Sequence, residues 1–290
     1  MAYNNGFSGD SVSLQYILKT LEAKTYDIPG VITSPSLQVT ANGESAFFYT
    51  RSKATAATGN AGDVISYVAK GAKRIDVPMV DRIAIGAIVP YVNVQNVSAD
   101  VIGDKVVQET IGQANLYNEG LISAIGTGAT AKTYTKDATA FSALVEAIAD
   151  FKKDNKVSGG LSPTGILASP AFFAELLVDS KINLAIVLKD GQVASDKVRR
   201  LDIPGLPCPV IECQDAGVGI DFYIVNCEGV AAPMVAKSLQ VVDATACGYP
   251  GGTLIAGELP YGFKIVTKSD DLTLDSSVGY LVAKYSESTI

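Results

Sequence analysis

Residues 98–126 read SADVIGDKVVQETIGQANLYNEGLISAIG, and this stretch decides the fold. Ser98 is a residue type that caps helix N-termini, and Gly126 is one that often ends helices. The apolar residues between them recur at helical spacing, with Asn118 as the one polar member of the row: Val107, Ile111, Ala114, Leu121 and Ile125. At 1.5 Å per residue, the predicted helix is about 40 Å long, which exceeds an average globular helix.

Three glycines lie inside this predicted helix, namely Gly103, Gly112 and Gly120. Each costs about 1 kcal/mol relative to alanine in a helix interior, so tertiary packing must hold the helix together. Glycine also permits the close approach of another backbone. We therefore expect either an ordinary core helix or a spine across which other segments lie, with Gly112 as a point of close approach.

The composition favours a chain that buries surface against copies of itself. The 290 residues suffice for one large domain or two ordinary ones. Hydrophobic residues make up 48% and charged residues only 18%, which suggests extensive burial. The net charge of −7 argues against a general nucleic-acid-binding protein. The same charge is compatible with a container that encloses nucleic acid without binding it tightly.

The sequence lacks histidine, which removes the commonest general base, the usual nucleophile pairs and the histidine-containing metal sites. The four cysteines are Cys208, Cys213, Cys227 and Cys247, and no pair of them has the C-x-x-C spacing of a zinc or redox site. We therefore interpret them as inert thiols in a reducing cytosol, with a disulfide or metal role as the alternative. Residues 1–10 are polar and no apolar run of 18 residues occurs, so we expect neither a signal peptide nor a membrane-spanning segment. We expect no cofactor and a cytoplasmic site of synthesis.

Four patterns that suggest chemistry fail on spacing or context. The glycine turn at 126–128 lacks the lysine of a phosphate loop. The glycine turn at 217–219 lacks the third glycine of a dinucleotide site. The aspartates at 270–275 lack the closing glutamate of a calcium loop. Glu109 and Glu119 are ten residues apart and would lie on different helix faces. No catalytic constellation remains, so we expect no enzyme.

Before the spine, the chain reads as an arm followed by a β-excursion. Residues 8–24 favour an amphipathic helix within a terminal arm, 1–36. Residues 37–94 carry strand patterns, with a hairpin-type Asn-Gly turn at 42–43. Between the strands, residues 50–63 are small and polar, as expected for the tip of an extended loop.

The excursion is basic although the chain is acidic. Between Tyr49 and Ile75, Asp63 is the only acidic residue, so this segment carries +4 within a chain of −7. A basic loop on an acidic body suits contacts between identical subunits, although a merely solvated loop explains the pattern equally well. The candidate inter-subunit contacts are Arg51, Lys53, Lys70, Lys73 and Arg74.

After the spine, strand and helix patterns alternate. Residues 141–151 form a helical apolar stripe, with Asp137 as the expected N-cap. A short strand at 165–168 precedes a helix that starts at Ser169-Pro170. The sequence DFYIVN at 221–226 reads as a buried strand, and strand patterns dominate from residue 239 onward. These features predict an α+β fold.

This order resembles the major capsid proteins of tailed bacteriophages, with the Hong Kong 97-type fold. Three local stretches carry the resemblance. The first is residues 74–80, followed by 82–91 and the 98–126 helix. The second is LDIPGLPCPV at 201–210 followed by DFYIVN, and the third is TLIAGELPYGFKIVT at 253–267. The resemblance implies an N-terminal arm (1–36), an extended β-loop (37–94), a discontinuous peripheral domain with the spine helix (95–135 and 236–290), and an axial α/β domain (136–235).

The resemblance also implies a structural protein that self-assembles into hexamers and pentamers of an icosahedral shell around packaged double-stranded DNA. Its partners would be its own copies, a separate scaffolding protein, a portal protein and, in some cases, decoration proteins. The shell would form in the host bacterial cytoplasm and enclose DNA without sequence-specific binding. The alternatives are an encapsulin-type nanocompartment shell protein and a surface or tail-associated binding protein.

Overall fold

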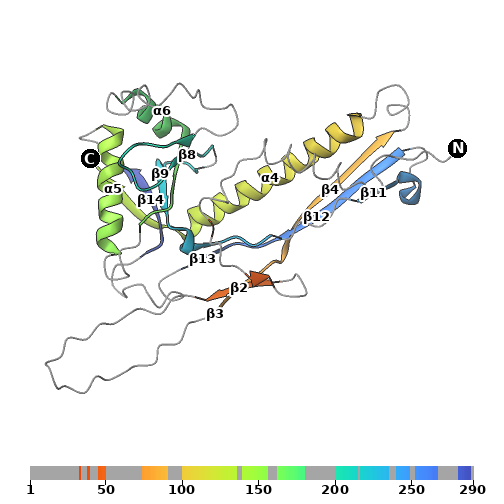
Figure 1. Cartoon of the computed structure of the whole chain (residues 1–290), viewed down its shortest axis with the longest axis horizontal. Helices are drawn as coiled ribbons and strands as arrows, with labels where there is room; N and C mark the ends of the chain where they lie inside the picture. The colour runs from red at the N-terminus through yellow and green to blue at the C-terminus, as the bar shows by residue number, and fades with distance from the viewer. Residues whose placement is uncertain are drawn as a thin grey trace, which may run out of the picture.

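The computed structural model describes residue 33 and eleven further stretches of the chain. They are 38–39, 45–49, 74–90, 100–135, 139–155, 162–179, 200–214, 216–234, 240–248, 252–266 and, at the end of the chain, 280–288. Within them the protein is a mixed α+β structure, with one long helix that extends away from a compact unit of sheet and helices (Figure 1). Apart from Thr33, the predicted arm 1–36 lies outside the described residues, as does the loop tip 50–63.

The described elements comprise helices and mostly short strands. The α-helices are α4 (Asp100–Gly128), α5 (Ala140–Asp154) and α6 (Pro170–Val178), and the 3-10 helices are η2 (Cys227–Gly229) and η3 (Ala244–Cys247). The strands are β1 (Gln38–Val39), β2 (Ser45–Tyr49), β3 (Arg74–Pro78), β4 (Asp81–Pro90), β5 (Thr130–Tyr134), β6 (Gly165–Ala168), β7 (Arg200–Leu201), β8 (Val210–Glu212), β9 (Phe222–Val225), β10 (Val230–Ala231), β11 (Gln240–Asp243), β12 (Gly252–Tyr261), β13 (Lys264–Ile265) and β14 (Val282–Glu287).

The long helix predicted from the sequence is confirmed as α4, but its predicted end is wrong. The helix continues past Gly126 to Gly128, and the amide of Ala129 still donates to the carbonyl of Ile125 at 2.8 Å. Leu121 and Ile125 are fully buried, as the apolar row predicted. The proposed cap Ser98 lies outside the described residues.

The centre of the compact unit is a six-stranded sheet with the order β5-β14-β9-β6-β8-β7. Every residue of β6 and of β9 is buried, because packed layers cover both faces of the sheet. Successive side chains of a strand point to opposite faces, so β9 directs Tyr223 and Val225 toward α4, and Phe222 and Ile224 toward α5 and α6. The strands predicted at 165–168 and within 221–226 are confirmed.

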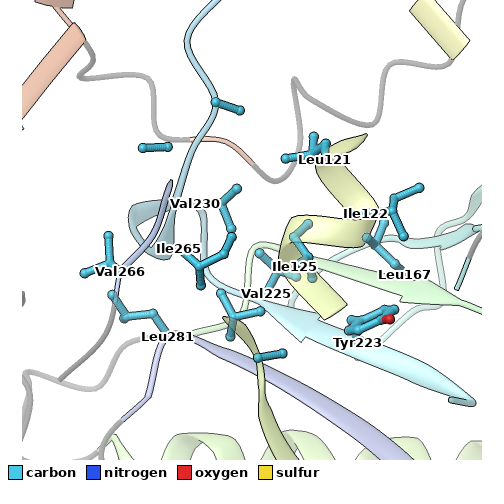
Figure 2. Close-up of a cluster of buried hydrophobic side chains, with 14 of the residues drawn as sticks. Leu121, Ile122, Ile125, Leu167, Tyr223, Val225, Val230, Ile265, Val266 and Leu281 are labelled. Atoms are coloured by element: carbon cyan, nitrogen blue, oxygen red, sulfur yellow. The ribbon is translucent and has the colours of Figure 1, made fainter. Parts of the chain in front are cut away.

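Two hydrophobic cores result from this layering. On one face, Leu121, Ile122 and Ile125 of α4 pack with residues from the sheet, from β13 and from Leu281, as Figure 2 shows. On the other face, the apolar sides of α5 and α6 cover the sheet with residues such as Leu144 and Phe173. The end of α4 is therefore enclosed by tertiary packing, which offsets its glycines.

A second sheet, β11-β12-β4, runs alongside α4 (Figure 1). Strand β4 pairs antiparallel with β12 along its whole length, from Asp81↔Tyr261 to Pro90↔Gly252. The predicted extended loop 37–94 therefore contains a strand, β4, that is part of the sheet beside the spine helix α4. Likewise, β5 and β14 join β9 and β6 in one sheet, whereas the family resemblance implies that these two pairs belong to different domains.

The start of α6 matches its sequence signature, and the start of α5 does not. Ser169 caps α6, its Oγ accepting from the amide of Phe172 at 3.3 Å, with Pro170 at the first helical position. The cap position of α5 is Thr139, whose side chain makes no capping bond, while the predicted cap Asp137 lies outside the described residues. Instead, Asp179 Oδ2 accepts from the amide of Phe141 at 3.4 Å, so the residue after α6 caps α5.

Candidate functional site

The base of the predicted basic loop is a hairpin of β2 and β3, extended by β1. Its inner face consists of buried apolar residues, and Phe48, Ile75 and Val77 join the core cluster beside α4. Alternation along the strands places polar and aromatic residues on the opposite face. Both ends of the intervening segment are thus anchored to the hydrophobic core.

The outer face of this hairpin carries a cation on an aromatic ring. The Arg74 guanidinium lies 4.2 Å from the centroid of Phe47 and forms an ion pair with Asp76 at 2.7 Å. Tyr49 is 55% exposed and packs edge-to-face on Phe47, with ring centroids 5.9 Å apart. Arg74 is exposed, and Asp76 of the same chain offsets part of its charge.

The other four candidate contacts are Arg51, Lys53, Lys70 and Lys73, and all lie outside the described residues. The structure therefore brings none of them into a described cluster with Arg74. The role of these five residues in contacts between subunits stays a prediction.

Close approach to α4 occurs at its second half and not at Gly112. A methyl group at Gly128 would lie 2.6 Å from Cβ of Ile265, and one at Gly120 would lie 2.9 Å from Cε2 of Phe263. Gly112 is exposed, and among the described residues no atom lies within 4 Å of such a methyl group, so the close approach expected there is not found within this part of the chain. The glycines that matter are those facing β13 and Phe263, which sequence periodicity alone did not distinguish.

An aromatic cluster fixes the middle of the spine. The Tyr117 hydroxyl donates to the carbonyl of Ala232 at 2.6 Å, and its ring packs against Tyr261 and Phe263. Burial raises the pKa of Tyr117 well above its usual value, so the phenol keeps its proton as a donor. This tyrosine therefore has a structural role.

A polar cluster at the end of α5 connects that helix to the sheet. Lys132 Nζ lies 3.0 Å from Asp154 Oδ2, and the Tyr280 hydroxyl donates to the same oxygen at 3.2 Å. The buried Asn155 accepts from the amide of Tyr280 at 3.1 Å. Burial, together with hydrogen bonding, raises the pKa of Tyr280, so the phenol of Tyr280 keeps its proton and acts as a hydrogen-bond donor.

A groove lies between the start of α5 and the end of α6. Its volume is about 600 Å³, and it is mostly apolar. Asp179, which caps α5, forms part of its wall. The lining residues are Thr139, Ala140, Ala174, Glu175, Val178 and Asp179.

The described residues contain no candidate metal centre. They contain no group of three or more His, Cys, Asp or Glu placed to hold a metal ion. Burial raises the pKa of Cys208 to about 12, so this thiol stays protonated and unreactive, in line with the interpretation of the sequence. Within the described part of the chain, no helix is long and apolar enough to cross a membrane.

No protein-family model and no curated protein sequence matches this chain. Solved structures do match. The capsid structure of the cyanophage P-SCSP1u is 12% identical with a TM-score of 0.62, and the match covers 92% of this chain and 90% of that one. A structure from Gordonia phage Cozz is 12% identical with a TM-score of 0.58, covering 92% and 88%. A virus-like particle from Pyrococcus furiosus is 14% identical with a TM-score of 0.54, covering 95% and 98%.

The cyanophage capsid structure and the Gordonia phage structure both match over most of the length of the two compared chains. At this level of sequence identity, they establish the fold. The chain has the fold of phage major capsid proteins, in agreement with the family resemblance of its sequence.

Proposed function

We propose that this chain is the major capsid protein of a tailed bacteriophage, with a structural and not a catalytic role. Many copies would assemble into hexamers and pentamers of an icosahedral shell around packaged double-stranded DNA. The observation that carries the proposal is the full-length match to a capsid structure, which leaves little of either chain unaccounted for. The absence of histidine fits a role without acid–base chemistry.

The parts of the chain take the roles of the Hong Kong 97-type architecture in this proposal. Helix α4 with the β11-β12-β4 sheet forms the peripheral domain, and the six-stranded sheet with α5 and α6 forms the axial domain. The hairpin β2–β3 is the base of the extended loop. We keep the predicted domain boundaries except for three strands. Strands β4, β5 and β14 are assigned to the domain of the strands with which they pair.

Self-assembly uses the charge asymmetry of the chain. The basic segment between residues 49 and 75 reaches a neighbouring copy, where Arg51, Lys53, Lys70, Lys73 and Arg74 meet an acidic body. Separate scaffolding and portal proteins and, where present, decoration proteins complete the shell in the host cytoplasm. The net negative charge suits a wall that encloses DNA without binding it by sequence.

The direct test is to express the chain alone and together with its candidate scaffolding protein. Size-exclusion chromatography and negative-stain electron microscopy should show capsomers or closed shells. A clean monomer of 30.2 kDa at high concentration, under both conditions, would contradict the proposal.

An encapsulin-type nanocompartment is the second candidate, because the virus-like particle from Pyrococcus furiosus matches at similar quality. The contents of particles purified from the producing cell distinguish the two. Nuclease-protected double-stranded DNA of uniform length indicates a phage head, whereas a folded protein cargo identified by mass spectrometry indicates a nanocompartment.

A further inference from the structure

Three segments that are distant in the sequence cross beside the middle of α4. They are the corner between β3 and β4, the turn between β12 and β13, and residues 232–234 after β10. The amide of Gly262 donates to the carbonyl of Pro233 at 3.1 Å, and Met234 forms an isolated β-bridge with Tyr261. The β2–β3 hairpin lies at this end of the paired strands β4 and β12 (Figure 1). The crossing therefore joins the base of the basic loop to the spine.

Gly262 has no room for a side chain at this crossing. A methyl group on it would overlap the carbonyl oxygen of Pro78 and would lie 3.4 Å from Cα of Met79. Both are backbone atoms, which cannot rotate away as the end of a flexible side chain can. The φ angle of Gly262 is not positive, so the position requires the missing side chain of glycine and not its conformational freedom.

Helix α4 closes the other side of the crossing. The ring of Phe263, the residue after Gly262, packs against Tyr117 of α4 with ring centroids 5.2 Å apart. The Tyr117 hydroxyl is itself held by its hydrogen bond to Ala232. Gly262 therefore cannot retreat from Pro78 without displacing this buried cluster, and an added methyl group would push the corner between β3 and β4 instead.

The corner that Gly262 contacts is short. Only Met79 and Val80 separate Pro78, the last residue of β3, from Asp81, the first residue of β4. Strand β3 pairs with β2, and β4 pairs with β12, so each side of the corner belongs to a different sheet. The position of the Pro78 carbonyl against Gly262 therefore sets the angle between the hairpin and the spine.

We propose that Gly262 is a positioning residue for assembly, which sets the direction in which the basic loop extends toward a neighbouring copy. This inference rests on the proposed function, in which that loop contacts another subunit. When the angle at the corner changes, each residue of the loop moves in proportion to its distance from the corner. A small displacement of Pro78 is therefore enough to misplace the basic side chains.

The test compares Gly262→Ala with two matched alanine variants. Gly128→Ala also forces a methyl group against a neighbour, Cβ of Ile265, but away from the crossing, whereas Gly86→Ala adds one in open space on β4. Assembly is measured by sedimentation velocity and electron microscopy, under conditions that give shells from the wild type and below the unfolding temperature of every variant. Hydrogen exchange of the β2–β3 amides in dispersed subunits shows whether the hairpin is intact.

We expect Gly262→Ala to keep the protected amides of the hairpin and to lose closed shells, while both other variants form shells. Shells of wild-type size from Gly262→Ala overturn the inference and leave the capsid function intact, whereas a wild-type chain that stays monomeric overturns both. Loss of shells in Gly128→Ala or Gly86→Ala counts against it, since assembly would then respond to any added methyl group. Loss of hairpin protection in Gly262→Ala also overturns it, because the contact would then serve folding.

A second variant leaves Gly262 in place. One glycine inserted between Met79 and Val80 lengthens the corner and should prevent shell formation, although the subunit folds. This variant decides the question if Gly262→Ala does not fold, and normal shells from it overturn the inference. Failure of both variants to fold overturns it as well, because the crossing would then be required for folding and not for direction.

Discussion

Lys284 Nζ lies 2.8 Å from the carbonyl oxygen of Gly126, so a strand near the end of the chain provides the cation that α4 lacks. The last turn of α4 contains no basic residue of its own. Carbonyl groups at a helix C-terminus have no partner within the helix and carry partial negative charge. The partly buried ammonium of β14 therefore stabilises the spine at the point where it meets the six-stranded sheet.

Replacing this lysine should destabilise the subunit. Lys284→Met keeps much of the aliphatic stem but removes a charged hydrogen bond, a type worth about 1.5–3 kcal/mol. We expect a loss of about 1–2 kcal/mol in the free energy of unfolding, measured by urea denaturation of the dispersed protein. The control Lys105→Met breaks only the surface pair with Glu109 and should cost a few tenths of a kcal/mol. Equal effects of the two changes would contradict this role of Lys284.

Glycine substitutions along α4 should have opposite signs. Gly112→Ala should stabilise the dispersed subunit by up to about 1 kcal/mol, because the methyl group enters open space and alanine favours the helix. Gly128→Ala should destabilise it by about 1–3 kcal/mol, because the methyl group overlaps the Cβ of Ile265. Urea midpoints of the two variants provide the comparison. A stabilised Gly128→Ala would show that β13 does not hold its place against the helix.

Alkaline conditions should unfold the subunit through its buried tyrosines. Burial, and secondarily the nearby Cys213, raises the pKa of Tyr223 to about 12, above the ordinary value of about 10. The unfolded chain releases this proton at lower pH than the folded chain, so the associated stability is present below about pH 10 and is lost between about pH 10 and 12. Tyr223→Phe should lower stability at neutral pH, because it removes the 2.6 Å hydrogen bond to Ala216, but its stability should fall less steeply above pH 10.

The steepness is measured by urea midpoints across this pH range, with tyrosinate absorbance as an independent signal. Parallel pH profiles for the wild type and Tyr223→Phe would contradict the assignment.

The basic loop should be needed for assembly and not for folding. Changing Arg51, Lys53 and Lys73 together to Glu should preserve the circular dichroism spectrum of the subunit and prevent shell formation. Individual exposed pairs contribute only about 0.2–1 kcal/mol, but a closed shell repeats them at every boundary. Normal shells at low ionic strength would rule out this role. Glu146→Lys is a control that alters charge on α5, outside the loop.

Local signals in the sequence predicted much of the fold. Helical periodicity identified α4, and the Ser169-Pro170 pair marked the start of α6, because capping and periodicity act within a few residues. Strand patterns within residues 37–94 and from residue 239 onward covered β4 and β12, but they did not show that these two strands are neighbours. Strand pairing over such distances along the chain leaves no local pattern.

The features that the sequence did not reveal are contacts between distant segments. Nothing local distinguishes Gly112 from Gly128, since only the position of Ile265 makes the latter indispensable. Asp179 caps α5 from the residue after α6, whereas the nearest acidic residue in sequence, Asp137, was the one expected. The candidate contacts of the loop were selected by charge alone, and only Arg74 is among the described residues.

Strand β14 lies between β5 and β9 in the six-stranded sheet, pairing with both. During translation, β5 emerges long before residues 282–287, and until those residues leave the ribosome it has no strand between itself and β9. The edges of β5 and β9 that pair with β14 would be exposed during that interval. Its length is set by the rate of synthesis, about 5–20 residues per second. The six-stranded sheet can therefore be completed only after residues 282–287 have been synthesised.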